Sequence, residues 1–130
     1  MVRSPKHRPP RVVIGHRNPG YAAMLGRQLA EVGWEGVTAD CAARARVLAR
    51  AERTVALLLD VNLPDESGWL TCDKVTRERP ELCVVLLSDD NGPENCRFAS
   101  FVGARALVRP GQDDGVLPRA FQACREAAAI

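Results

Sequence analysis

Short apolar runs alternate with amphipathic stretches along the whole chain. Five of these runs are rich in valine, leucine and isoleucine and predict strands. They cover residues 11–15, 35–40, 54–60, 82–88 and 104–109. The third and fourth runs, TVALLLD and LCVVLLS, are almost wholly apolar, which is typical of strands that are covered on both faces of a parallel sheet.

The stretches between the runs show helical spacing of apolar residues. In the first of them, Leu25, Leu29 and Val32 recur at i, i+4 and i+7 and share one helix face. The five predicted helices span residues 18–34, 41–53, 67–80, 92–103 and 113–129. Strand and helix alternate with short connections, so we expect an α/β fold: a doubly wound five-stranded parallel sheet with five helices on its two faces.

Polar residues stand where three of the predicted strands end. His16 and Arg17 follow the first strand, Asp60 ends the third, and Ser88 ends the fourth. Doubly wound sheets bind ligands at the carboxyl ends of their strands. We therefore expect these side chains to converge at one edge of the sheet.

The net charge of +2 is unevenly distributed over the 130 residues. Residues 1–11 contain four basic residues and no acid. We interpret residues 1–10 as a disordered basic tail and residues 11–130 as one domain. The tail has no aromatic residue on which a base could stack, so nucleic-acid binding is not indicated.

No apolar run approaches the ~20 residues that span a bilayer, and we expect a cytoplasmic protein with no membrane partner.

The five cysteines show no metal or disulfide pattern. Their number is odd, no two have CxxC spacing, and the two histidines complete no metal spacing. The pattern indicates buried small apolar residues and neither a disulfide framework nor a zinc site.

The stretch LLLDVNLPDESG, residues 57–68, resembles the receiver domains of bacterial two-component response regulators, and the resemblance extends over residues 11–128. In these domains the aspartate at the position of Asp60 accepts a phosphoryl group, and a proline and a glycine, here Pro64 and Gly68, shape the following loop. The resemblance implies the CheY-like, flavodoxin-like fold with strand order 2-1-3-4-5.

The resemblance also gives roles to residues near the ends of the fourth and fifth strands. Ser88 matches the switch hydroxyl of the family, and Arg109, before Pro110, stands where the family has a lysine. The family's switch aromatic is missing, because Ala106 or Leu107 falls at its position.

The chain departs from the family at the metal site. Receiver domains hold Mg²⁺ with an acidic pair after the first strand, but here His16 and Arg17 occupy those positions. Mg²⁺ prefers oxygen ligands. Two unit charges 4 Å apart interact by roughly 4 kcal/mol at an effective dielectric of 20, so an arginine in place of a carboxylate opposes the ion strongly. We expect no metal and no other cofactor. Asp89 and Asp90 are candidate substitute ligands, but they leave from a different strand.

These observations favour an atypical receiver, or pseudo-receiver, that is not an enzyme. Phosphorylation at Asp60 is expected to be impaired or independent of Mg²⁺, and Arg17 and Arg109 are expected to pair with Asp60. The chain would signal by contact with a protein partner, a histidine kinase or an output domain, with a homodimer through the fourth and fifth helices as a further option.

Two alternatives remain open. One is a functional phospho-accepting receiver in which Arg17 and His16 replace Mg²⁺ and Asn62 lines the same pocket. The other is a module that binds an anion among His16, Arg17 and Arg109 without a covalent step. A third reading, a phosphatase of the haloacid dehalogenase type, fits poorly because Asn62 stands where that family usually has a second aspartate.

Overall fold

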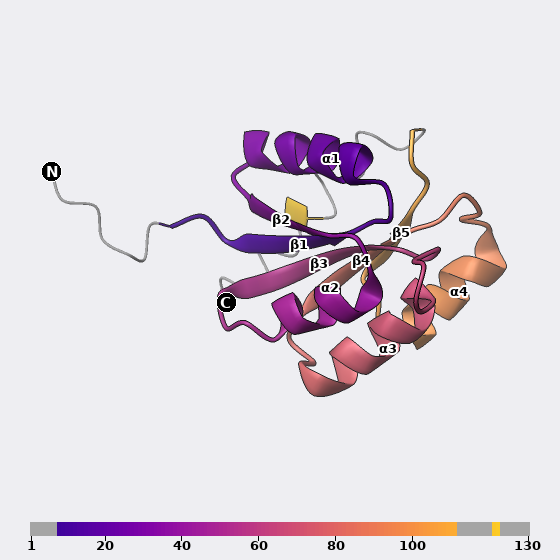
Figure 1. Ribbon diagram of the computed structural model, residues 1–130. Coiled ribbons are helices and arrows are strands. Elements are labelled where there is room, and N and C mark those ends of the chain that lie inside the picture. Colours follow the sequence, from indigo (N-terminus) through magenta and orange to yellow (C-terminus); the bar gives the residue numbers. More distant parts are fainter. Residues whose placement is uncertain (1–7, 112–120, 123–130) are drawn as a thin grey trace, which may run out of the picture.

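The computed structural model describes residues 8–111 and 121–122, and the structural statements below concern these residues. Five strands form one parallel sheet in the order β2-β1-β3-β4-β5 (Figure 1). Their bounds are β1 Arg11–Gly15, β2 Glu35–Ala39, β3 Thr54–Asp60, β4 Cys83–Leu87 and β5 Ala106–Val108. The predicted doubly wound sheet and its strand order are confirmed.

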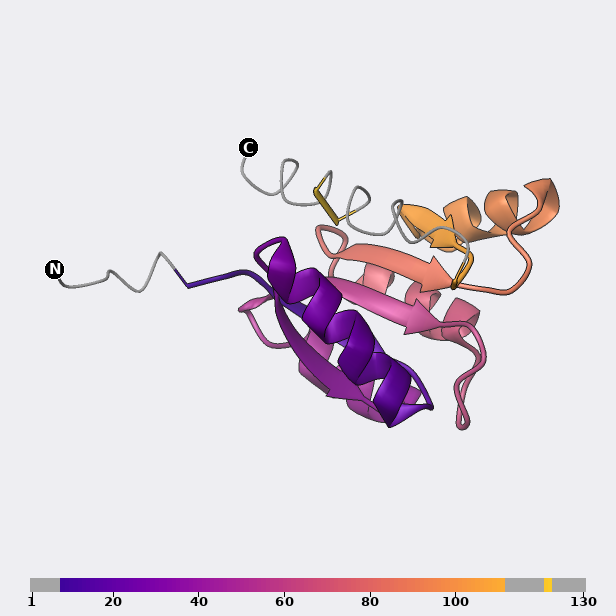
Figure 2. The same ribbon diagram turned by 90° about the horizontal axis from the view of Figure 1, so that it is seen from above.

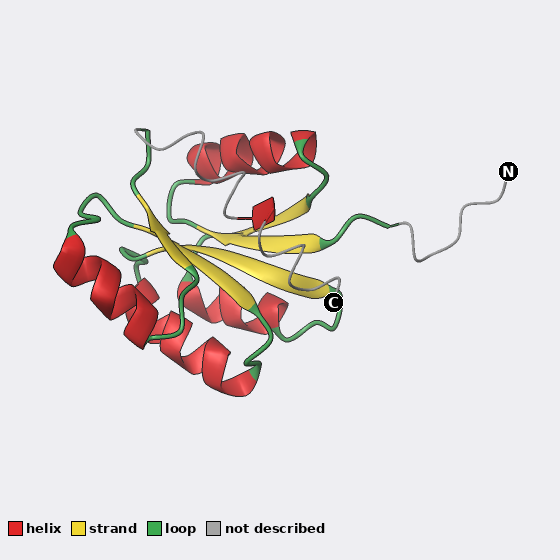
Figure 3. Ribbon diagram, turned by 180° about the vertical axis from the view of Figure 1, so that it is seen from behind, coloured by secondary structure: helices red, strands yellow, loops and turns green. Residues whose placement is uncertain are grey.

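Four helices connect the strands within the described part of the chain. Their bounds are α1 Pro19–Glu31, α2 Ala42–Ala49, α3 Gly68–Glu78 and α4 Pro93–Phe101. Seen from behind, α1 covers one face of the sheet, and α2, α3 and α4 cover the other (Figure 3). The predicted fifth helix, residues 113–129, lies outside the described residues except for Phe121 and Gln122, which are helical.

Alternation along the strands divides the core into two layers. Leu57 and Leu59 of β3 face the layer under α2 and α3, and Leu58 faces the layer under α1. All three leucines have no exposed surface. The two central strands, β3 and β4, run side by side in the same direction (Figure 2) and are buried on both faces, as their apolar sequences predict. The last strand is shorter than predicted, because only Ala106–Val108 pairs with β4.

One cysteine departs from the sequence-based expectation. Cys83 is disulfide-bonded, whereas Cys41, Cys72 and Cys96 are free. The expectation that the cysteines act only as small apolar residues is therefore wrong for Cys83. It holds for Cys72, which is completely buried and whose pKa is raised by that burial to about 12. None of the helices in the described ranges is long and apolar enough to cross a membrane.

The short helix α2 is held at both ends by residues that flank α3. Its N-cap residue Cys41 makes no side-chain capping bond. Asp65, in the loop before α3, instead accepts the N–H groups of Ala42 at 2.8 Å and Ala43 at 2.9 Å. At the other end, Arg79 Nη1 donates to the carbonyl oxygens of Ala49, Ala51 and Thr54 at 2.7, 3.0 and 2.8 Å. An acid at the N-terminus and a cation at the C-terminus both match the helix dipole.

We expect Asp65→Ala to lower the urea midpoint of unfolding. The bonds from Ala42 and Ala43 hold the pKa of the Asp65 carboxyl below its usual range. A carboxyl with a lowered folded-state pKa stabilises the fold above its unfolded-state pKa, and this stabilisation is lost as the pH falls through the folded-state pKa. The midpoint difference between wild type and Asp65→Ala should therefore shrink on acidification. Asp40→Ala, an exposed acid nearby, is the control. If the difference in urea midpoint between wild type and Asp65→Ala does not change with pH, the ionised Asp65 carboxylate does not stabilise the start of α2 as described.

Candidate functional site

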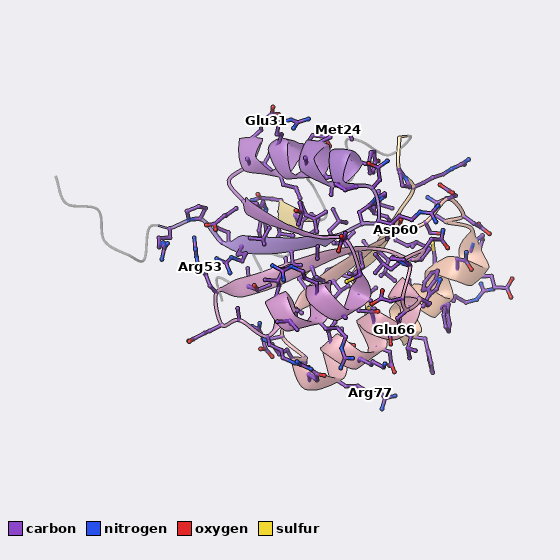
Figure 4. All side chains as sticks on the ribbon, in the orientation of Figure 1. Met24, Glu31, Arg53, Asp60, Glu66 and Arg77 are labelled. Carbon is purple, nitrogen blue, oxygen red and sulfur yellow. The ribbon has the colours of Figure 1, made fainter. Side chains whose placement is uncertain are left out.

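The carboxyl ends of β1, β3 and β4 meet at a cavity of about 340 Å³. Asp60 is labelled at this edge of the sheet in Figure 4. The cavity is lined by His16, Arg17, Asn18, Tyr21, Asp60, Asn62, Leu87, Ser88, Asp89 and Pro110. Five of the six predicted site residues therefore line one cavity. The sixth, Arg109, is exposed directly after β5 and is not among the lining residues.

Asp60 is fixed from behind by the start of α3. Its Oδ1 accepts the backbone N–H of Asn62 at 3.0 Å. Gly68 donates its N–H to the Val61 carbonyl at 2.9 Å, and this brings the two backbones into direct contact. A Cβ on Gly68 would lie 2.3 Å from the Asp60 carbonyl oxygen, so the position requires glycine.

Replacing Gly68 with alanine is expected to displace the Asp60 backbone or the start of α3. We expect a loss of about 1–3 kcal/mol in the free energy of unfolding, as for other overpacked sites, measured by urea denaturation. Gly26→Ala in α1 is the matched control, because its Cβ would meet only Ile14 Cδ1 at 3.6 Å, an ordinary contact. An unchanged unfolding free energy in Gly68→Ala would contradict this close approach.

His16 is the residue that contacts the Asp60 carboxylate. Its Nε2 lies 3.3 Å from Asp60 Oδ2, and each of the two side chains is only 14% exposed. The other ring nitrogen, Nδ1, accepts the backbone N–H of Asn18 at 3.0 Å. Because Nδ1 acts as an acceptor, the proton of the neutral ring is on Nε2, the nitrogen that lies 3.3 Å from Asp60 Oδ2.

The surroundings favour the neutral form of His16. Burial is the main cause that lowers the pKa of the imidazole, and the charge of Arg17 lowers it further, while Asp60 acts in the opposite direction. At ordinary pH the ring beside Asp60 is thus neutral. A positive charge is not needed for this contact.

Arg17 lies at the cavity without pairing with Asp60. It is exposed, and the ion pairs within 4.0 Å among the described residues join Asp60 to His16 and not to Arg17. The expectation that Arg17 pairs with Asp60 is therefore wrong. The reason is geometric: His16 directly follows the buried end of β1 and faces inward, whereas Arg17 is one residue further into the loop.

Ser88 and the acids that follow it form the opposite side of the cavity. Ser88 is only 6% exposed, and its Oγ accepts the backbone N–H of Asp90 at 3.2 Å. Asp90 Oδ1 in turn accepts the Gly92 N–H at 2.9 Å, so this carboxylate belongs to the loop before α4. Asp89 lines the cavity, but Asp90 does not.

The residues present do not fit a magnesium ion. Of the two Asp60 oxygens, one faces His16 and the other accepts an N–H. Within the described ranges, no group of three or more histidine, cysteine, aspartate or glutamate side chains is arranged to hold a metal. A cavity that places an imidazole and a guanidinium beside this carboxylate offers poor ligands to an ion that prefers oxygen.

Asn18 and Tyr21 are among the cavity residues that were not predicted from the sequence. The side chain of Asn18 caps α1 by accepting the Tyr21 N–H at 3.1 Å. This cap places the Tyr21 ring 4.9 Å from the His16 ring, between centroids. The sequence contains a signal for this arrangement, which is Asn18-Pro19 directly before a helix. An asparagine at the cap accepts the N–H of the third helical residue, here Tyr21, when proline occupies the first helical position.

Comparison with known proteins supports the assignment of the fold. No family model matches the chain. The chain is similar to the BeF3-activated DrrB receiver domain, with a TM-score of 0.77 and 22% identity over 89% of this chain and 97% of that one. It is also similar to a receiver domain protein from Clostridium thermocellum, with a TM-score of 0.82 and 16% identity over 92% and 98% of the two chains. This chain has the receiver fold of response regulators.

A similarity in sequence supports the same receiver fold. The chain is 33% identical over 94 residues to the probable transcriptional regulatory protein TcrX of Mycobacterium tuberculosis. The match covers 72% of this chain and 40% of TcrX, so the chain spans well under half the length of that relative.

The contact between His16 and Asp60 can be tested by NMR titration of the histidine C–H signals. We expect the pKa of His16 to lie below 6.5 in the wild type. It should fall further in Asp60→Asn, because the carboxylate that favours the protonated ring is removed. His16→Gln identifies the signal against that of the other histidine, His7. A pKa of His16 that does not respond to Asp60→Asn would contradict the contact.

Proposed function

We propose that this chain is an atypical receiver domain in which His16 occupies the carboxylate that receiver domains phosphorylate. The observation that supports the proposal is the 3.3 Å approach of His16 Nε2 to Asp60 Oδ2 inside a cavity that does not fit Mg²⁺. In this view the chain keeps the receiver scaffold and signals by contact with a protein partner, while phosphorylation at Asp60 is impaired.

The physical argument concerns charge. Phosphoryl transfer to a carboxylate brings together two anions, and in most phosphoryl-transfer sites a metal ion compensates this repulsion. Here a neutral imidazole lies 3.3 Å from one Asp60 oxygen, and the exposed Arg17 brings a positive charge to the same cavity. A positive charge at the cavity opposes the entry of a second cation, and solvent weakens this repulsion because Arg17 is exposed. The site is thus disfavoured for Mg²⁺ and for the chemistry that depends on it.

The proposal carries expectations that rest on the receiver fold. The partner is a histidine kinase or an output domain, the chain performs no enzymatic turnover, it needs no cofactor, and it acts in the cytoplasm. The homodimer surface predicted from the sequence includes a fifth helix that lies mostly outside the described residues.

Restoring the acidic pair tests the proposal. The wild type and His16→Asp/Arg17→Asp are incubated with acetyl phosphate and Mg²⁺, and the intact mass is measured. We expect no phosphoryl adduct on the wild type and an adduct on the double variant, because two carboxylates recreate an oxygen-rich site beside Asp60. Adding Asp60→Asn to the double variant should abolish the adduct. Circular dichroism checks that each variant is folded. A Mg²⁺-dependent adduct on the wild type at Asp60 would disprove the proposal.

The second candidate function is a phospho-accepting receiver that works without Mg²⁺. It is favoured by the presence of His16, Arg17, Asn62 and Ser88 around a single cavity, since all four carry groups that donate hydrogen bonds to an anion. The same experiment with EDTA separates the two. An adduct on wild-type Asp60 that persists in EDTA and disappears in Arg17→Ala supports this candidate and replaces the first.

A further inference from the structure

Helix α4 buries little of its own apolar surface. Among its nine residues, all within the described ranges, Ala99 alone is buried, whereas α1 and α2 each bury three residues and α3 buries four. Phe98 is 45% exposed and Phe101 is 81% exposed. The helix lies at one end of the layer formed by α2, α3 and α4 (Figure 1). Much of the surface of these two rings is therefore open to solvent or to another molecule.

The two rings continue a row of aromatic side chains that begins on α3. The ring centroids of Trp69 and Phe98 are 5.1 Å apart, and those of Phe98 and Phe101 are 6.3 Å apart. We call these three residues the aromatic row. Neighbouring apolar side chains that are exposed together on a soluble protein are typical of a surface that binds another protein.

Two charged residues accompany the row on α4. Glu94, Arg97, Phe98 and Phe101 stand at i, i+3, i+4 and i+7, so they share one helix face. Glu94 and Arg97 are exposed, and neither takes part in a salt bridge among the residues that the structure describes. A partner surface of a single sign would be attracted by one of these charges and repelled by the other. Two copies of the face complement each other when their helices run antiparallel.

We infer that two copies of this chain associate through the aromatic row, with their α4 helices antiparallel about a twofold axis. In such a dimer every contact occurs twice, and Glu94 of each copy lies on the side of the partner's Arg97. The mixed charge of the face selects a second copy as its occupant. The inference goes beyond the function proposed above, because it uses α3 and α4 and does not depend on the state of Asp60.

The size of the aromatic row indicates a weak association. With roughly 200 Å² for each phenylalanine, the exposed parts of Phe98 and Phe101 amount to about 250 Å² per copy. A standard interface buries about 800 Å² on each partner, so the rings would form its core and polar residues its rim. We therefore expect monomers at low protein concentration and dimers at high concentration.

Sedimentation equilibrium of the full chain between about 5 and about 500 µM tests the association. We expect the weight-average mass to rise from 14.2 kDa toward twice that value. Phe101→Ser should require about tenfold more protein for the same rise, because the dimer loses the ring twice. Val47→Ser on α2, which also removes an exposed apolar residue, is the matched control and should leave the rise unchanged. Circular dichroism checks that each variant is folded.

Two results would overturn the association through this face. One is a chain that stays monomeric throughout, as expected if a different protein covers the aromatic row. The other is a dimer that Phe101→Ser and Val47→Ser affect equally, because the interface then lies elsewhere on the chain.

An exchange of charges tests the orientation of the two helices. Glu94→Arg and Arg97→Glu each place like charges opposite each other in the proposed dimer, so each should weaken association, and more strongly at low salt. The double variant restores opposite charges and should recover association close to that of the wild type. Urea denaturation of each variant at low protein concentration separates any effect on α4 itself. A double variant that associates no better than the single variants would overturn the antiparallel arrangement.

Discussion

The contact between the His16 imidazole and the Asp60 carboxylate joins the ends of β1 and β3 at the cavity on the edge of the sheet. A carboxylate that is largely withdrawn from water needs partners that compensate for its lost hydration. In this chain one oxygen has the Asn62 N–H and the other faces His16. The ring is itself oriented by the Asn18 N–H, which belongs to the cap of α1. The position of the Asp60 carboxylate is thus linked, through His16 and Asn18, to the start of α1.

The geometry of this contact depends on bonds further away. The loop that follows Asp60 is held by Gly68 against Val61 and by Asp65 against the start of α2. Arg79, just after α3, fixes the other end of α2. These bonds join α2 and α3 to each other next to Asp60. The position of His16 is set separately, by the end of β1 and by its bond with Asn18. The 3.3 Å contact between His16 and Asp60 therefore joins two parts of the site that are held in place by different bonds.

Much of the fold is predictable from the sequence, because the spacing of apolar residues within a short stretch indicates both its secondary structure and its buried face. The apolar runs of β3 and β4 predicted buried parallel strands, and the polar residues at their ends predicted the cavity. The contacts that a polar side chain makes depend on residues far away in the sequence, so a short stretch does not reveal them. The sequence shows that two groups capable of carrying positive charge follow β1, but it does not show that His16 contacts Asp60 while Arg17 is exposed at the rim of the same cavity. For the same reason the cap of α2 by Asp65, from 23 positions away, and the bonding of Cys83 were not foreseen.

The stretch from Leu57 to Gly68, which carries the resemblance to receiver domains, specifies mainly the fold. Leu57, Leu58 and Leu59 fill both layers of the core, and Leu63 is buried beside α3. Asp65 caps one helix and Ser67 caps the next, where its Oγ accepts the Trp69 N–H at 3.1 Å.

Gly68 belongs to the same group of structural positions, because its backbone lies against that of Asp60. Each of these residues would be needed in a receiver scaffold that never accepts a phosphoryl group. Their presence is therefore weak evidence for the reaction. The evidence about chemistry comes from the two positions after β1, where an imidazole contacts Asp60 and a guanidinium lines the same cavity.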